Sequence, residues 1–217
     1  MILNPKTFPY SSKIKNIIFD FGGVICNIDV RLTEKRFLEL GVKSFDTQYS
    51  VVERDTLFGK LEEGTISPDD FRLEIRNFFS HTVTDLEIDD AWNALLLDIP
   101  MPRIRLIEAL RNNYRLFLLS NSNEIHYQKY RKNFEDQFGY KDFDSLFEKA
   151  YFSYQLKLKK PGRAVFEYVL NDSRLNPEET LFIDDSIQHV KGATVAGMHA
   201  YHLNLVSGET ILDLFSS

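Results

Sequence analysis

The 217-residue chain has one cysteine, Cys26, and no run of about 18 apolar residues. A single thiol cannot form a disulfide within the chain, so we expect a reducing compartment, the cytoplasm. The missing apolar run excludes a transmembrane helix. We do not expect a signal peptide either, because the first residues lack its basic-then-apolar order and contain Pro5 and Pro9.

Basic residues are also in short supply, with 26 Lys and Arg against 32 Asp and Glu and a formal net charge of −6. A nucleic-acid-binding surface needs a basic footprint, so we do not expect nucleic acid as a partner. The missing apolar run likewise argues against a membrane as a partner. Apolar residues, in contrast, make up 43% of the chain, including 18 Phe and 10 Tyr. The chain can therefore bury a substantial core, as one large domain or one domain with a modest insertion.

The stretch Lys13–Ile28 is the most informative part of the sequence. Three apolar residues end on Asp20, which is followed by a phenylalanine and then by Gly22 and Gly23. A short run of β-formers bounded by glycines predicts a buried strand that stops abruptly. Ligands of α/β sheets bind outside the carboxyl ends of the strands, and a carboxylate there needs a cation or a donor to stay ionised. Taken alone, the stretch is equally compatible with Asp20 as a simple turn cap.

Residues 31–99 show helical periodicity and no convincing strand. Ser67 followed by Pro68 and two acids predicts a helix N-terminus, as does the capping-box pair Thr84 and Glu87. We expect helices over residues 31–40, 49–61, 68–79 and 84–97. This stretch is too long for a simple crossover between strands and predicts a helical insertion.

Beyond Pro100, buried apolar runs alternate with amphipathic ones. We expect strands over residues 114–119, 149–153, 180–183 and 198–203, in addition to the first strand before Asp20. We expect helices over residues 104–112, 124–137, 163–170, 187–196 and 209–215, and an extended lead-in over residues 1–12. Strands that alternate with helices imply a parallel sheet covered on both faces, so the predicted fold class is α/β.

Four loops that follow predicted strands carry polar residues. They hold Asp20, Ser120 with Asn121, Lys160, and Asp184 with Asp185. Each is weak evidence alone, because acids, Ser-Asn pairs and lysines are common in turns and loops. Parallel strands present their carboxyl ends at one edge of the sheet, so the four loops together predict a single site.

These loops resemble the motifs of the haloacid dehalogenase superfamily over nearly the whole length of the chain. The matching motifs are Asp20-Phe21-Gly22-Gly23-Val24, Leu119-Ser120-Asn121, Lys160-Pro161 and Phe182-Ile183-Asp184-Asp185-Ser186. The tracts that begin at Ser120 and at Phe182 look most like those of bacterial sugar-phosphate phosphatases. The resemblance implies a Rossmann-like core of residues 1–29 and 100–217, with an inserted all-helical cap of residues 30–99.

The resemblance also implies a chemistry. Asp20 would attack phosphorus and form an aspartyl-phosphate intermediate. A Mg²⁺ ion would be held by Asp20, Asp185 and the Gly22 carbonyl, with Asp184 in or beside the outer shell. Two carboxylates about 4 Å apart repel by roughly 4 kcal/mol at an effective dielectric near 20, and a divalent cation reverses that sign. Oxygen-only ligands favour Mg²⁺.

The remaining roles concern the phosphate and the substrate. By resemblance, Ser120 and Asn121 would donate to phosphoryl oxygens, and Lys160 would neutralise negative charge, as catalytic residues. For substrate binding we expect Asn121, His126 and Glu62, the last in the cap turn Glu62-Glu63-Gly64. A solvated Glu62 and a His126 that only satisfies a hydrogen bond within its helix are the alternatives.

Two positions depart from the family pattern. Gly22 stands where many family phosphatases carry a second aspartate, which serves as general acid and base and is worth about 10²–10⁴-fold in rate. His126, Asp184 and His189 are candidates to replace it. His189 also stands where the family often has an acid that holds the metal's waters, although a helix histidine with an ordinary hydrogen bond is the simpler interpretation.

Three functional hypotheses follow. The first is a Mg²⁺-dependent phosphatase that acts on a small phosphorylated metabolite, such as a sugar phosphate. The second is a 2-haloacid dehalogenase that works without a metal, although the Asp184-Asp185 pair would then crowd Asp20. The third is a phosphate-ligand-binding protein whose catalysis has weakened. The sequence does not set the oligomeric state, and a monomer is the default expectation.

Overall fold

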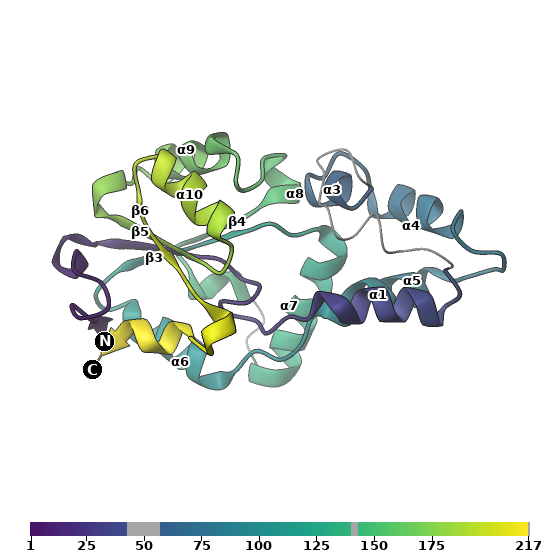
Figure 1. The fold of residues 1–217 in the computed structure, drawn as a ribbon, viewed down its shortest axis with the longest axis horizontal. Helices are drawn as coiled ribbons and strands as arrows, with labels where there is room; N and C mark the ends of the chain where they lie inside the picture. The colour runs from purple at the N-terminus through teal and green to yellow at the C-terminus, as the bar shows by residue number, and fades with distance from the viewer. Residues whose placement is uncertain (43–56, 140–142, 217) are drawn as a thin grey trace.

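The computed structural model describes residues 1–42, 57–139 and 143–216. Its centre is a five-stranded parallel sheet with the strand order β4-β3-β2-β5-β6 (Figure 1). The strands are β2 (Asn16–Phe19), β3 (Arg115–Ser120), β4 (Lys149–Phe152), β5 (Thr180–Asp184) and β6 (His199–His202). All five lie where the sequence predicts strands, within a few residues, and the α/β fold class is confirmed.

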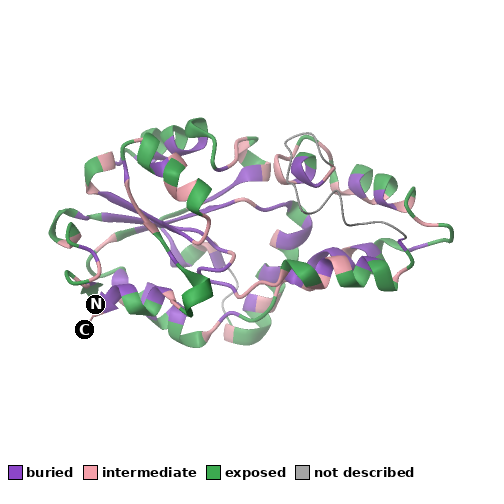
Figure 2. Ribbon diagram, viewed as in Figure 1, coloured by how far each residue is buried: buried purple, intermediate pink, exposed green. Residues whose placement is uncertain are grey.

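Helices cover both faces of this sheet (Figure 1). Alternate residues of β2 point to opposite faces: Ile17 and Phe19 join one apolar cluster and Ile18 joins another. The first cluster includes residues of α6 (Met101–Leu110) and α7 (Glu124–Phe138), and the second includes residues of α9 (Arg163–Asp172) and α10 (Ile187–Val195). The three central strands β2, β3 and β5 are accordingly buried over nearly their whole length, while the edge strand β6 is only partly buried (Figure 2).

A helical segment follows β2, over the residues predicted as the cap. Its described helices are α1 (Val30–Glu39), α3 (Leu57–Glu62), α4 (Pro68–Arg76) and α5 (Asp85–Trp92). They bury a separate apolar cluster that includes Phe37, Phe71 and Trp92, together with Ile125 of α7. Figure 1 shows these helices beside the sheet, with α3 next to α8 (Ser153–Leu156), the short helix that follows β4. The domain boundaries at residues 29/30 and 99/100 stay a prediction.

The helix start predicted at Ser67 and the capping box predicted at Thr84 are confirmed, and Ser67 also forms a capping box, with Asp70. Ser67 accepts from the Asp70 amide ahead of α4, and Thr84 accepts from the Glu87 amide ahead of α5. The helix predicted over 68–79 ends early, at Arg76, where Asn77 caps it. Of the helix predicted over 49–61, residues 49–56 lie outside the described part of the chain.

The helix predicted over residues 209–215 is wrong. Ile211–Leu214 forms one 3₁₀ turn, and Phe215–Ser216 is a short strand, β7, that pairs antiparallel with β1 (Ile2–Leu3). Thr210 and Asp213 make a capping box, but only this one turn follows it before the chain becomes extended. The extended lead-in therefore contains a strand, and the two ends of the chain lie side by side (Figure 1). None of the described helices is long and apolar enough to cross a membrane.

Candidate active site

Three aspartates meet at the carboxyl ends of β2 and β5. Asp20 directly follows β2, Asp184 ends β5, and Asp185 comes next. These two strands are parallel neighbours, and the Asp20 amide continues their ladder by donating to the Ile183 carbonyl at 2.9 Å. One carboxylate oxygen from each aspartate lies within 4.8 Å of the others. The structure thus brings together three residues that the sequence placed in one site.

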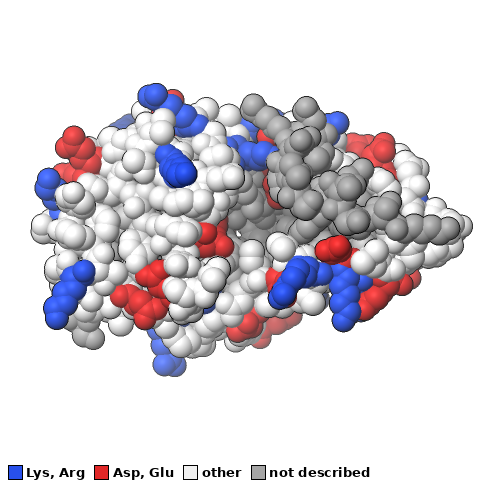
Figure 3. All heavy atoms as spheres, viewed as in Figure 1, with Lys and Arg blue, Asp and Glu red and all other residues white. Residues whose placement is uncertain are grey.

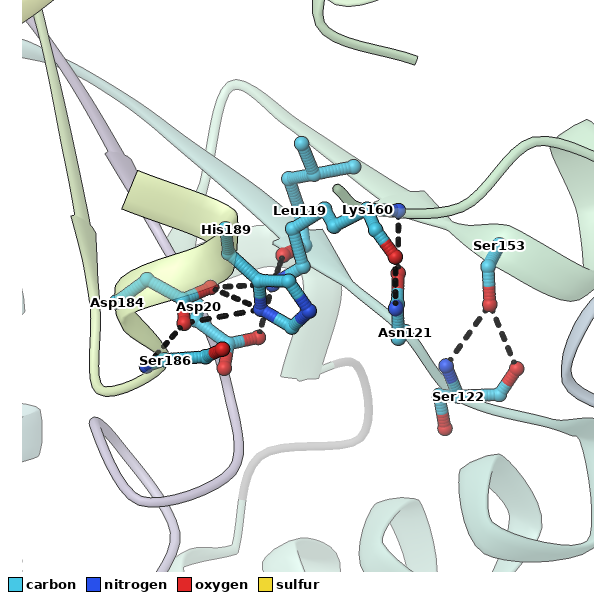
Figure 4. A network of polar contacts seen from close by, with 9 residues as sticks. All are labelled: Asp20, Leu119, Asn121, Ser122, Ser153, Lys160, Asp184, Ser186 and His189. Carbon is cyan, nitrogen blue, oxygen red and sulfur yellow. Dashed lines mark hydrogen bonds and ion pairs between the residues drawn. The ribbon is translucent and has the colours of Figure 1, made fainter. Parts of the chain in front are cut away.

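Lys160 lies at the centre of this cluster, with its side chain fully buried. Its ammonium nitrogen is 2.7 Å from Asp20 Oδ1 and 2.7 Å from Asp184 Oδ2. It also donates to the Leu119 carbonyl at 2.9 Å, at the end of β3 (Figure 4). The loop that carries Lys160 is therefore tied to three strand ends at once, and all three donor positions of the ammonium are used.

Asn121 holds the backbone of that loop. Its amide nitrogen donates to the Lys160 carbonyl at 2.9 Å, and its amide oxygen accepts from the Lys160 amide at 3.0 Å (Figure 4). This side-chain contact positions Lys160, a role that the sequence did not indicate. Ser120 is the last residue of β3 and directly precedes Asn121 in the chain. It is 3% exposed.

Asp184 is held on several sides. It accepts from the Ser186 amide at 2.8 Å, and His189 Nδ1 lies 3.0 Å and 3.1 Å from its two oxygens (Figure 4). With Lys160, these contacts occupy both carboxylate oxygens. The structure therefore places His189 against Asp184, and Asp184 has less free coordinating capacity than its neighbours.

Asp185 lies against Gly23. A Cβ atom at Gly23 would come within 2.5 Å of Asp185 Oδ2, and Gly23 has φ +75°, which L side chains rarely adopt. Only glycine meets both demands at this position. No backbone amide of the described residues donates to the Gly22 carbonyl, so this oxygen could serve as a ligand.

The charges of the cluster are unbalanced. Burial raises the pKa of Asp20 to about 7, although Lys160 opposes the shift. Burial and the neighbouring Asp184 raise the pKa of Asp185 to about 6. Burial acts the same way on Asp184, but Lys160 and His189 outweigh it and lower its pKa to about 2. One ammonium does not neutralise three carboxylates, so this all-oxygen donor set fits a hard divalent cation such as Mg²⁺.

The turn after α3 packs against the core beside this cluster. The Ser153 hydroxyl lies 2.7 Å from the Glu62 carbonyl and accepts from the Ser122 amide at 2.9 Å, so one side chain links the turn to the loop after β3 (Figure 4). Gly64, with φ +62°, lies so close to Tyr154 that a Cβ would meet its carbonyl at 2.1 Å.

Charged groups close the same contact. Lys157 donates to the Gly64 carbonyl at 2.7 Å, and Lys159 lies 3.6 Å from the Glu63 carboxylate. Burial raises the pKa of Glu62, while Lys159 and Lys160 oppose that shift. The space-filling view of the molecule shows acidic side chains at the edge of a hollow near its centre (Figure 3).

His126 lies in the first turn of α7 and faces the helical segment. Its Nδ1 is 2.8 Å from the Asn93 side-chain oxygen, and its ring stacks on Trp92 with the ring centres 4.9 Å apart. Burial lowers the pKa of His126 to about 3. The neighbouring Asn123 caps α7 and accepts from the His126 amide. His126 is thus a neutral residue of the contact between α7 and the helical segment.

Comparisons with known proteins agree with this geometry. A family model for haloacid dehalogenase-like hydrolases matches residues 14–197. Over 177 residues the chain is 34% identical to a D-ribitol-5-phosphate phosphatase of Bacteroides thetaiotaomicron, a match that covers 82% of this chain and 85% of that protein.

Solved structures give the same result. A HAD family enzyme of Bacteroides thetaiotaomicron, crystallised with magnesium and inorganic phosphate, superposes with a TM-score of 0.85 at 36% identity, covering 94% of this chain and 100% of that one. A HAD-like family hydrolase of Porphyromonas gingivalis gives a TM-score of 0.79 at 34% identity, covering 88% and 91%. The resemblance noted in the sequence is confirmed, and the chain belongs to the haloacid dehalogenase-like hydrolase family.

Proposed function

We propose that this hydrolase is a Mg²⁺-dependent phosphatase that removes phosphate from a small phosphomonoester, a phosphorylated sugar or sugar alcohol. The observation that carries the proposal is the cluster of Asp20, Asp184 and Asp185 around the buried Lys160. The similarity to a D-ribitol-5-phosphate phosphatase supports the substrate class.

In this proposal Asp20 is the nucleophile. One of its oxygens attacks phosphorus, the bond to the leaving alcohol breaks, and an aspartyl-phosphate forms, which water then hydrolyses to inorganic phosphate. Lys160 holds the Asp20 carboxylate and offsets negative charge on the phosphoryl group. Ser120 and the Asn121 backbone donate to phosphoryl oxygens, and the Asn121 side chain keeps Lys160 in place.

Magnesium would be held by Asp20, Asp185 and the Gly22 carbonyl, with Asp184 at the edge of this set. When bound, the ion supplies positive charge that offsets the repulsion between carboxylates and phosphate. Asp184 already accepts from Lys160, Ser186 and His189, so its main contribution is to fix these partners. Gly23 lets Asp185 approach the site closely.

Residues 30–99 serve as a cap in this proposal. The cap would close over the reaction centre, exclude water and contribute to specificity. Glu62 and His126 are the proposed contacts to the part of the substrate beyond the phosphate, together with Asn121. We further propose that the enzyme acts as a monomer in the cytoplasm.

A panel of phosphorylated sugars and sugar alcohols tests this function. Phosphate release should require Mg²⁺, stop with EDTA, and disappear in the Asp20→Asn variant. Halide release from 2-haloacids that is indifferent to EDTA would instead identify a dehalogenase. Thermal stabilisation by the same phosphates without turnover would identify a binding protein.

A further inference from the structure

The proposed reaction needs a proton donor, and the aspartates of the cluster have other roles in it: Asp20 is the nucleophile, Asp184 holds Lys160 and His189, and Asp185 is a proposed metal ligand. When the bond to phosphorus breaks, an unactivated alcohol leaves as a strong base unless it is protonated. Position 22 is a glycine, and a Cβ there would lie 3.2 Å from Ile28 Cδ1. The Ile28 side chain thus fills the space into which a side chain at position 22 would extend.

The histidines near the site in the described part of the chain already have partners, and His202 Nε2, for example, lies 3.0 Å from the Asp185 carbonyl. His126 Nδ1 lies 2.8 Å from the Asn93 side-chain oxygen, and the ring stacks on Trp92. Burial lowers the pKa of His126 to about 3, so the ring is not an acidic imidazolium near neutral pH. His189 Nδ1 faces both oxygens of Asp184.

Glu62 is a further acidic residue, on the turn that packs against the loop after β3. It ends α3, and its carbonyl oxygen lies 2.7 Å from the Ser153 hydroxyl, which also binds the Ser122 amide in the loop after β3. The residue is therefore fixed to the same loop that carries Ser120 and Asn121.

The surroundings of the Glu62 carboxyl suit a proton donor. The charged groups that act on it are Lys159, Glu63 and Lys160, the last of which binds Asp20 directly. Burial outweighs the two lysines and raises the pKa of Glu62, which favours the protonated form at higher pH than for an exposed glutamate.

We propose that Glu62 is the general acid and base of this enzyme, in place of the aspartate that is missing at position 22. As Asp20 attacks phosphorus, the Glu62 carboxyl gives its proton to the leaving oxygen. The Glu62 carboxylate then takes a proton from the water that attacks the aspartyl-phosphate, which regenerates both groups. This inference rests on the proposed phosphatase function.

The test compares two substrates whose leaving groups differ in basicity and therefore in their need for a proton from the enzyme. The value of kcat/KM reports steps up to phosphorylation of the enzyme, so it isolates the proton donation. It is measured for wild type, Glu62→Gln and the neighbouring control Glu63→Gln, with p-nitrophenyl phosphate and with the best alkyl phosphate of the panel. Unchanged thermal unfolding shows that each variant is folded.

Glu62→Gln should lower kcat/KM for the alkyl phosphate by about 10²–10⁴-fold. For p-nitrophenyl phosphate, whose leaving group needs no proton, the change should stay below about tenfold. Glu63→Gln should change neither value by more than a fewfold, and Glu62→Asp should recover part of the loss. The wild-type kcat/KM for the alkyl phosphate should fall at alkaline pH, with no such fall in Glu62→Gln.

Equal losses for both substrates in Glu62→Gln, or no loss for either, would overturn the assignment of Glu62 while leaving the phosphatase function intact. Phosphate release that survives EDTA and the Asp20→Asn substitution would overturn the proposed function itself. The two failures are therefore distinguishable in one set of assays.

Discussion

The Lys160 ammonium lies 2.7 Å from the Asp20 carboxylate, although the two residues are 140 positions apart in sequence. A fully buried lysine side chain is costly unless opposite charges and hydrogen-bond acceptors surround it. Lys160 has two carboxylates and one carbonyl as acceptors. Its position therefore depends on the whole cluster, and the cluster depends on it.

Lys160→Met should destabilise the protein and reduce phosphate release. Without the ammonium, the buried Asp20 carboxylate loses its ion-pair partner and Asp184 keeps only Ser186 and His189. Breaking a buried ion pair in this way costs about 3–5 kcal/mol of unfolding free energy. Urea unfolding without Mg²⁺ measures this loss. Lys191→Met, at an exposed position of α10, is the control and should change the free energy by less than about 0.5 kcal/mol. A loss below about 1 kcal/mol for Lys160→Met would contradict this account of the cluster.

Gly23→Ala should weaken metal activation. The new methyl group would clash with Asp185 Oδ2, and φ +75° adds backbone strain. We expect the Mg²⁺ concentration for half-maximal activity to rise about 10–100-fold. Gly139→Ala is a matched control, because Gly139 has φ +73° with nothing within 4 Å of a Cβ. If Gly23→Ala reaches half-maximal activity at the same Mg²⁺ concentration as wild type and Gly139→Ala, Gly23 does not position Asp185.

Magnesium should stabilise the fold through Asp185. A cation that binds only the native state adds about 2.7 kcal/mol at a hundred times its dissociation constant. Thermal unfolding with Mg²⁺ and with EDTA measures this effect in wild type and in Asp185→Asn. We expect a rise in Tm in wild type and a much smaller one in the variant. Equal rises would place the cation elsewhere.

His126 should make the protein less stable as the pH falls. Burial lowers its pKa to about 3 from the ordinary 6.5, so below pH 6.5 the unfolded chain binds a proton that the native state does not. The free energy of unfolding then falls by at most about 1.4 kcal/mol per pH unit. His126→Asn should show a weaker dependence between pH 6.5 and pH 4.5. Parallel curves for the two proteins would show that His126 does not contribute, since the other groups are common to both.

The sequence was sufficient to predict the sheet and the convergence of its loops. Short apolar runs ending on Asp20, Ser120 and Asp184 predict buried strands, and the parallel arrangement then brings their ends together. These predictions depend on local patterns and on one topological rule. The helix starts at Ser67 and Thr84 were predictable for the same reason, because the residues that mark each start lie within four positions of sequence.

Contacts between distant segments were not predictable. Nothing near Asn121 in the sequence indicates that its side chain holds the Lys160 backbone, and no local pattern marks Ser153 as the link between Glu62 and Ser122. The final strand was missed because its partner is at the other end of the chain. The repeated Ser-Asn in residues 120–123 indicates a loop rich in hydrogen-bonding side chains. It does not indicate which distant residue each side chain binds.

The most direct test of the central claim is mass spectrometry of enzyme quenched in acid during turnover of its best phosphorylated substrate with Mg²⁺. The account predicts one added phosphoryl group on the peptide that contains Asp20 in the wild-type enzyme. It predicts none in Asp20→Asn, together with a loss of phosphate release of at least about 10³-fold. Phosphate release by Asp20→Asn at the wild-type rate, with the Asp20 peptide of the wild type unmodified, would contradict the account.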